Sequence, residues 1–123
     1  MTTLTITLPW PDSRLGQNGR GDRRALTSLR RDAKNAGYLL ALKASRESGW
    51  SIGDAKALRI TYEFNPPDRR GRDLDNMLGC MKSCSDGVAR AIGMDDAKWR
   101  EITLRMGDVT KPGLVTMTVE VME

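Results

Sequence analysis

The chain of 123 residues contains no histidine. This absence excludes Ser-His-Asp and Cys-His catalysis, zinc and iron sites that depend on imidazole, and an imidazole general base at neutral pH. Any proton transfer must therefore use Asp, Glu, Lys or Tyr, or a water on a metal that carboxylates hold.

Cysteines and long apolar stretches are also scarce. Cys80 and Cys84 lie in a segment that we expect to be helical, where they share a face without disulfide geometry, so we interpret them as small buried residues of a reduced protein. No apolar run approaches the ~20 residues that span a bilayer. Residues 1–10 lack the basic start and apolar stretch of a secretion signal. These absences predict a cytoplasmic protein without membrane contact, and its length predicts a single domain over residues 1–123.

Positive charge is unevenly distributed along the chain. The formal net charge is +4, but residues 14–34 hold seven cations against two carboxylates, a local net charge of +5. A concentrated basic segment is typical of a surface that binds nucleic-acid phosphates, and a solvated basic helix face is the alternative. The seven cations are Arg14, Arg20, Arg23, Arg24, Arg30, Arg31 and Lys34.

The hydrophobic pattern predicts four strands and two helices in the order βαβαββ. Strands are indicated by period-two alternation and helices by apolar side chains spaced three to four residues apart. Each strand has one apolar face, and in the third we expect Ile102, Leu104 and Met106 to point inward. This pattern indicates a two-layer α+β fold, with a single mixed four-stranded sheet and both helices on one face. The expected strands cover residues 3–8, 58–64, 100–106 and 114–122, and the helices cover residues 26–48 and 76–92.

Charged residues gather between the second strand and the second helix. Asp73 and Asp75 are two residues apart, so in an extended chain both carboxylates point the same way. Their repulsion costs about 4 kcal/mol at ~4 Å in an effective dielectric near 20 unless a cation lies between them. Oxygen-only ligands favour Mg²⁺, with Mn²⁺ as the alternative. Asp95 and Asp96, after the helix, offer a third carboxylate.

A simpler interpretation of the two aspartates stays open. Asp75 can cap the helix, and Asp73 can pair with a nearby arginine. An EF-hand is excluded, because its calcium loop needs Asp or Asn at Met77, Gly at Leu78 and Glu at Cys84.

Lys82 follows Asp75 by seven residues on the expected helix. This spacing puts both side chains within about 20° of one helix face and about 10 Å apart along the axis. The ammonium group can stabilise charge that develops on a phosphate, with Asp86 four residues further on to hold it. An ordinary surface Lys-Asp pair is the alternative.

Several segments together carry a family resemblance. They are residues 6–11 (Ile-Thr-Leu-Pro-Trp-Pro), residues 67–76 (Pro-Asp-Arg-Arg-Gly-Arg-Asp-Leu-Asp-Asn), Lys82, residues 86–87 (Asp-Gly) and residues 95–96 (Asp-Asp). In these the chain resembles the RusA-like crossover junction endodeoxyribonucleases, which resolve Holliday junctions. The resemblance covers most of the chain and is weakest between residues 13 and 56.

The resemblance implies a homodimeric, Mg²⁺-dependent nuclease that cuts symmetrically across four-way junction DNA in recombination and repair. It also implies a phage or prophage origin and no organic cofactor. Its metal-binding carboxylates fall on Asp73, Asp75 and Asp96, with Asp95 as the alternative third ligand, and its essential basic residue falls on Lys82. The family lysine stands three residues after the Asp-Asn pair, where this chain has glycine, so Lys82 lies about 4.5 Å further along a helix.

We therefore expect phosphodiester hydrolysis by a metal-bound water, because no histidine is available as a base. Paired cuts require two sites related by a two-fold axis, and either the threonine-rich sheet face or the second helix can make the dimer contact. A non-catalytic DNA-binding module and an RNA-processing nuclease are the alternatives. The residues expected to hold phosphates are Arg14, Arg20, Arg23, Arg24, Arg69, Arg70 and Arg72.

Overall fold

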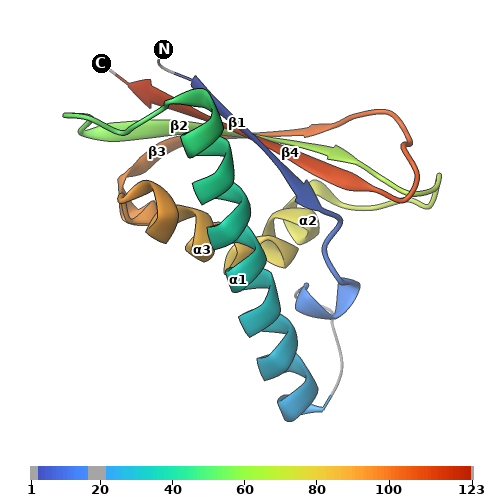
Figure 1. Cartoon of the computed structure of the whole chain (residues 1–123). Helices are drawn as coiled ribbons and strands as arrows, with labels where there is room; N and C mark the ends of the chain where they lie inside the picture. The colour runs from blue at the N-terminus through green and yellow to red at the C-terminus, as the bar shows by residue number, and fades with distance from the viewer. Residues whose placement is uncertain (1–2, 17–21, 123) are drawn as a thin grey trace.

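The computed structural model describes residues 3–16 and 22–122 (Figure 1). The four strands are β1 (Thr3–Pro9), β2 (Ala57–Asn65), β3 (Trp99–Met106) and β4 (Leu114–Met122). They form one open sheet in the order β1-β4-β2-β3, in which β4 is antiparallel to both neighbours and β2 is parallel to β3. All helices lie on one face of this sheet (Figure 1). The predicted two-layer α+β fold with a mixed sheet is confirmed.

The core forms between the sheet and its helices. Along β1 and β2 the residues of the inner face are buried in strict alternation, as predicted, and along β4 the alternation holds as far as Val119. Burying one large aliphatic or aromatic side chain contributes about 1.5–3 kcal/mol. The opposite face is polar and includes ion pairs from Arg59 to Glu101 and Glu120. The largest fully buried side chains of the strands are Leu4, Ile6, Leu8, Leu58, Ile60, Tyr62, Phe64, Val115, Met117 and Val119.

Strand β3 departs from the expected burial. Its register with β2 places Ile102, Leu104 and Met106 on the helix-facing side, as predicted. Only Leu104 packs against the core, whereas Ile102 is 46% exposed and Met106 is 39% exposed. All three therefore point to the predicted side of the sheet, but Ile102 and Met106 are not buried there. β3 is an edge strand, and alternation reports the direction of a side chain but not whether a helix covers it.

The predicted second helix is two helices. α2 (Leu74–Cys80) ends at Met81, and α3 (Lys82–Ile92) starts there. The Met81 amide donates to the carbonyl of Leu78 at 3.0 Å, a tighter turn than the α-helical pattern, with φ −89° and ψ 0°. Met81 is itself fully buried. A single helix over residues 76–92 is thus wrong, and Lys82 begins a new helix instead of sharing an axis with Asp75.

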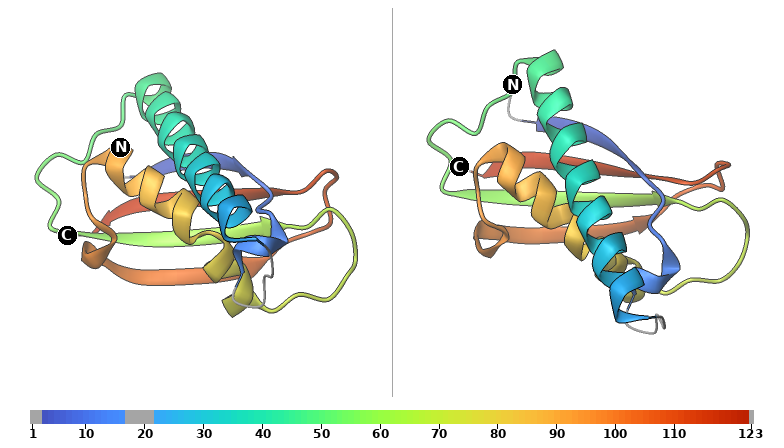
Figure 2. Two further views of the ribbon diagram at one scale, coloured as in Figure 1. Left: turned by 90° about the horizontal axis from the view of Figure 1, so that it is seen from below. Right: turned by 60° about the horizontal axis from the view of Figure 1, so that its bottom comes forward.

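The long helix α1 (Arg23–Ser48) crosses α3 at a pair of glycines. A Cβ atom on Gly37 would lie 2.1 Å from the Cys84 carbonyl oxygen, and one on Gly87 would lie 2.0 Å from that of Lys34. The two backbones therefore touch directly (Figure 2). The N-terminal half of α1 extends beyond the sheet, next to the short helix η1 (Ser13–Leu15) (Figure 1).

Within residues 3–16 and 22–122, no helix combines the length and apolarity that crossing a bilayer requires.

Candidate active site

An open cavity of about 560 Å³ lies between α2, α3 and β3, and we call it the acidic cavity. Asp75 from α2, Lys82 from α3 and Asp96 from the short helix η2 (Asp96–Lys98) all line it. Three of the four predicted catalytic residues, from three separate elements, therefore meet at one place. The break at Met81 contributes to this arrangement, because it gives Lys82 a direction independent of α2.

Asp73 comes two residues before Asp75 in the sequence, but it is not among the residues that line the acidic cavity. It is the N-cap residue of α2, where its carbonyl accepts the Met77 amide at 3.0 Å while its exposed side chain makes no capping bond. The Asp75 carboxylate accepts the amide of Asn76 at 3.0 Å. In the described part of the chain, no three acidic or cysteine side chains lie close enough to hold one metal ion together.

Lys82 is the centre of a charged network at the acidic cavity. Its Nζ lies 2.8 Å from Asp96 Oδ2 and 3.1 Å from Asp86 Oδ1, and its side chain is 66% exposed. Hydrogen bonds to Asp96 and then Asp86 raise the pKa of Lys82, so the ammonium stays charged at neutral pH. The bond from Lys82 in turn lowers the pKa of Asp96. Asp95 instead caps η2, accepting the Ala97 amide at 3.1 Å.

The wall of the acidic cavity contains polar groups that the sequence analysis missed. The hydroxyls of Tyr62 and Ser85 lie 2.6 Å apart, both residues are buried, and both line the cavity. Burial raises the pKa of Tyr62 to about 12, so its hydroxyl is neutral. The one signal in the sequence was Ser85, a polar residue in the buried stripe of a helix. Trp99 also lines the cavity, and its Nε1 is buried without a hydrogen-bond partner among the described residues.

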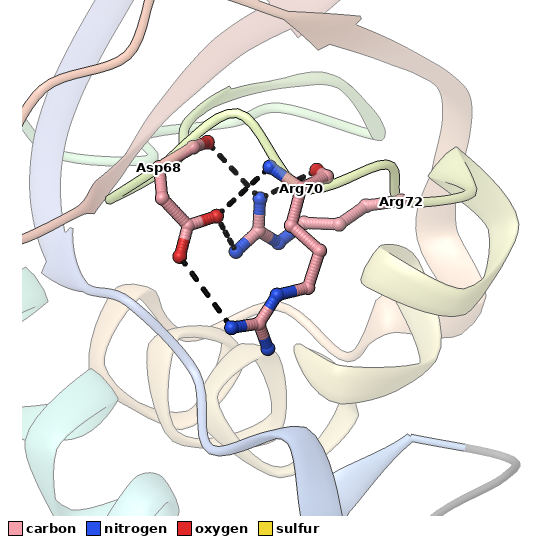
Figure 3. A network of polar contacts seen from close by, with 3 residues as sticks. All are labelled: Asp68, Arg70 and Arg72. Carbon is pink, nitrogen blue, oxygen red and sulfur yellow. Dashed lines mark hydrogen bonds and ion pairs between the residues drawn. The ribbon is translucent and has the colours of Figure 1, made fainter.

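Two of the loop arginines predicted to hold phosphates are engaged by Asp68 (Figure 3). Arg72 donates to the Asp68 carboxylate at 2.8 Å and to the carbonyls of Arg70 and Asp68 at 2.8 and 3.3 Å. Its guanidinium lies over the Trp10 ring, 5.2 Å from the centroid, and its side chain is 15% exposed. Arg70 donates its amide to Asp68 and extends a mostly exposed side chain. Arg69 is exposed.

The remaining predicted phosphate ligands lie near η1 and the start of α1. Arg14 donates from Nε and Nη2 to the two oxygens of Asp12, at 3.0 and 2.8 Å. Arg23 and Arg24 are exposed in the first turn of α1. Arg20 lies outside the described residues.

Comparisons with known proteins define the class to which this arrangement belongs. No protein-family model matches the chain. The chain is 31% identical over 122 residues to the crossover junction endodeoxyribonuclease RusA of Escherichia coli K12, an alignment that covers 97% of this chain and 95% of that protein. It is 34% identical, with the same coverage, to the crossover junction endodeoxyribonuclease of Enterobacteria phage 82. These relatives are enzymes that act on DNA crossover junctions, as their names state.

The chain belongs to the RusA family of crossover junction endodeoxyribonucleases. An uncharacterized protein of Xylella fastidiosa is a further relative, 32% identical over 115 residues that cover 94% of this chain and 74% of that protein. Among solved structures, PurLQS from Thermotoga maritima matches with a TM-score of 0.39 and 14% identity. That match covers 98% of this chain but only 18% of the other, and it is too weak for a structural argument.

Proposed function

We propose that this chain resolves Holliday junctions by hydrolysing DNA phosphodiesters at the acidic cavity. The observation that carries the proposal is the meeting of Asp75, Lys82 and Asp96 at one open cavity, in a chain that aligns over 97% of its length with RusA enzymes. An acid pair beside a cation matches phosphodiester hydrolysis, in which charge develops on phosphate oxygens. A non-catalytic DNA-binding module has no need for carboxylates that repel phosphate.

The donor set fits a hard divalent cation. The acidic cavity offers carboxylate oxygens from Asp75 and Asp96, and Asp73 stands two residues before Asp75. We assign Mg²⁺ to these three residues, with Mn²⁺ as the alternative, because both ions prefer oxygen ligands. In the described structure the three carboxylates are not close enough to hold one ion together, so binding requires their side chains to move toward each other. Asp96 is favoured over Asp95 as the third ligand because Asp95 is used to cap η2. When bound, the ion supplies a water of lowered pKa as nucleophile.

The protein's own contribution to catalysis is assigned to Lys82. Its ammonium is charged, exposed and at the rim of the acidic cavity, where it can neutralise a phosphate oxygen in the transition state. Asp86, one helical turn further on in α3, holds the ammonium while Asp96 takes part in metal binding. Lys82 therefore takes the role of the family lysine, although it stands three residues later in the sequence.

Paired cutting requires two acidic cavities, so we propose a homodimer that nicks two strands of the junction symmetrically. The function in the cell is DNA recombination and repair, and the place of action is the cytoplasm. A phage or prophage origin is supported by the relative from Enterobacteria phage 82.

The substrate is tested by offering the protein a synthetic four-way junction and a linear duplex of the same sequence. With Mg²⁺ present we expect paired nicks in the junction and an intact duplex, and with EDTA we expect no cutting of either. Equal cutting of both substrates would leave a nuclease but not a resolvase, and binding without any cutting would favour the DNA-binding module. Cutting of an RNA duplex in preference to the junction would favour the RNA-processing alternative.

The acidic cavity is tested by Asp75→Asn, with Asp54→Asn as the matched control. Asp54 is an exposed aspartate in the turn that precedes β2, away from the acidic cavity. We expect Asp75→Asn to slow cleavage at least ~100-fold, the scale of losing one group that acts on transition-state charge. Binding to the junction in EDTA should stay equal or tighten, because a negative charge near phosphate is removed. Wild-type cleavage by Asp75→Asn would contradict the assignment.

A further inference from the structure

A second groove, of about 370 Å³, lies on the other side of Gly79 and Lys82 from the acidic cavity. These two residues line both hollows, so the groove and the cavity are adjacent. Arg14 from η1 and Arg30 from α1 also line the groove. Among the described residues that line it, none is Asp or Glu, so its charge is opposite in sign to that of the acidic carboxylates next door.

The two arginines are held in place by rigid parts of the fold. η1 is packed tightly on α2, since a Cβ atom on Gly16 would lie 2.7 Å from the Asn76 side chain and 3.0 Å from Cys80 Sγ. Asp12 accepts two hydrogen bonds from the Arg14 guanidinium, which has five N–H donors in all, and so orients the group without using up its donors. Arg30 is carried by α1, whose position over α3 is fixed by the close contact at Gly37.

We propose that this groove, the guide groove, binds a phosphodiester that neighbours the one being cut, and that Arg30 is a positioning residue for the DNA strand. The proposal rests on the proposed function, because it places a second phosphate of the same strand beside the acidic cavity. Lys82 lies on the boundary between the two hollows and can contact the strand as it passes. The guide groove attracts phosphate through its cations alone, whereas the acidic cavity repels phosphate until a metal ion is bound.

Arg31 supplies a matched control for Arg30. It is the next residue of α1, has the same charge, is exposed, and lies 3.7 Å from Asp32 instead of lining the guide groove. Arg30→Gln and Arg31→Gln therefore change the net charge equally. A general loss of electrostatic attraction weakens DNA binding in both, while loss of a defined phosphate contact appears in Arg30→Gln only.

The experiment uses the four-way junction in EDTA, with a single neutral methylphosphonate placed in turn at each linkage around the cut. In the wild type we expect one neighbouring position at which the neutral linkage weakens binding about tenfold, the size of one charge-assisted hydrogen bond. In Arg30→Gln the same linkage should cause no further loss, and the salt slope of binding should fall by about one relative to wild type. Arg31→Gln should keep the full tenfold sensitivity. Thermal unfolding of both variants checks that the fold is intact.

The outcomes separate the two proposals. If Arg30→Gln remains as sensitive as Arg31→Gln at every linkage while the wild type still cuts junctions with Mg²⁺, the guide groove is overturned and the proposed function stands. If the wild type does not cut but Arg30→Gln alone loses the linkage sensitivity, the groove binds DNA and the proposed function fails.

Discussion

Two charged clusters lie on either side of α2, and they differ in what their cations contact. At Asp68, the guanidinium of Arg72 is mostly buried over Trp10 and donates to two backbone carbonyls as well as to a carboxylate. At the acidic cavity, the side chain of Lys82 is mostly exposed, and its ammonium donates to the carboxylates of Asp86 and Asp96. The first cluster fixes the course of a loop, while the second leaves its charges open to a ligand.

Residue type alone therefore does not distinguish charged side chains that hold a loop in place from those that are open to a ligand. Both clusters contain aspartates and basic residues within a short stretch of sequence. A cation that donates to backbone carbonyls stabilises a loop conformation, because those carbonyls otherwise lose hydrogen bonds on burial. A cation at the rim of an open cavity can exchange its partners. Substitutions in the two clusters should therefore affect different measurements.

The largest effect is expected for Lys82→Gln, on cleavage. Loss of this ammonium should slow junction cutting by about 10²–10³-fold, as for other groups that act on transition-state charge. The free energy of unfolding should change by less than about 1 kcal/mol, because exposed ion pairs contribute little. Single-turnover kinetics and urea denaturation measure the two quantities. Lys98→Gln, an exposed lysine in η2, is the control, and an equal loss of activity in it would remove the special role of Lys82.

The reverse pattern is expected for Arg72→Gln. Removing a mostly buried guanidinium with three hydrogen bonds should lower the free energy of unfolding by about 1–3 kcal/mol. Arg70→Gln should stay within about 0.5 kcal/mol of wild type, because its side chain is exposed and its amide bond to Asp68 remains. Urea denaturation measures both free energies of unfolding, provided that the variants unfold with the same dependence on urea concentration. Equal destabilisation by the two variants would show that the Asp68 cluster depends on its surface charge.

The smallest effect is expected in the acid dependence of stability. Hydrogen bonds from the Arg70 amide and from Arg72 lower the pKa of Asp68 below its ordinary 3.8. Because the folded pKa is the lower one, this contribution is fully present above about pH 4 and is lost as the pH falls through the folded pKa. Between pH 5 and pH 2, the Tm of Asp68→Asn should therefore fall less steeply than the Tm of Asp54→Asn. Parallel declines would contradict the assignment.

Much of the fold follows from local patterns. β1, β2 and β4 begin and end within one residue of the predicted bounds, because each has one face on the core and one in water. The turn at Met81 could not be found this way, since no proline or capping residue marks it and it depends on packing of a buried side chain. The exposure of Ile102 depends on the position of β3 at the sheet edge, which alternation does not encode.

The candidate site was predictable in composition but not in arrangement. The spacing of charged residues and the family resemblance identified Asp75, Lys82 and Asp96, which meet at the acidic cavity. Asp73 does not line that cavity, and its assignment as a metal ligand stays a prediction. The burial of Arg72 beneath its loop is decided by contacts between residues distant in sequence. The hydrogen bond between Tyr62 and Ser85 also joins residues distant in sequence. Neither contact can be recognised from the periodicity of the sequence.

The glycine crossing of α1 and α3 sets the spacing of two helices that carry basic side chains. Gly37 and Gly87 are buried, yet their lack of side chains sets how closely the helix that carries Arg30 approaches the helix that carries Lys82. A methyl group at either glycine would lie 2.0–2.1 Å from a backbone oxygen of the other helix, so the two helices would have to move apart. The spacing of two helices that carry basic side chains at the surface is thus determined by hydrogen atoms in the interior.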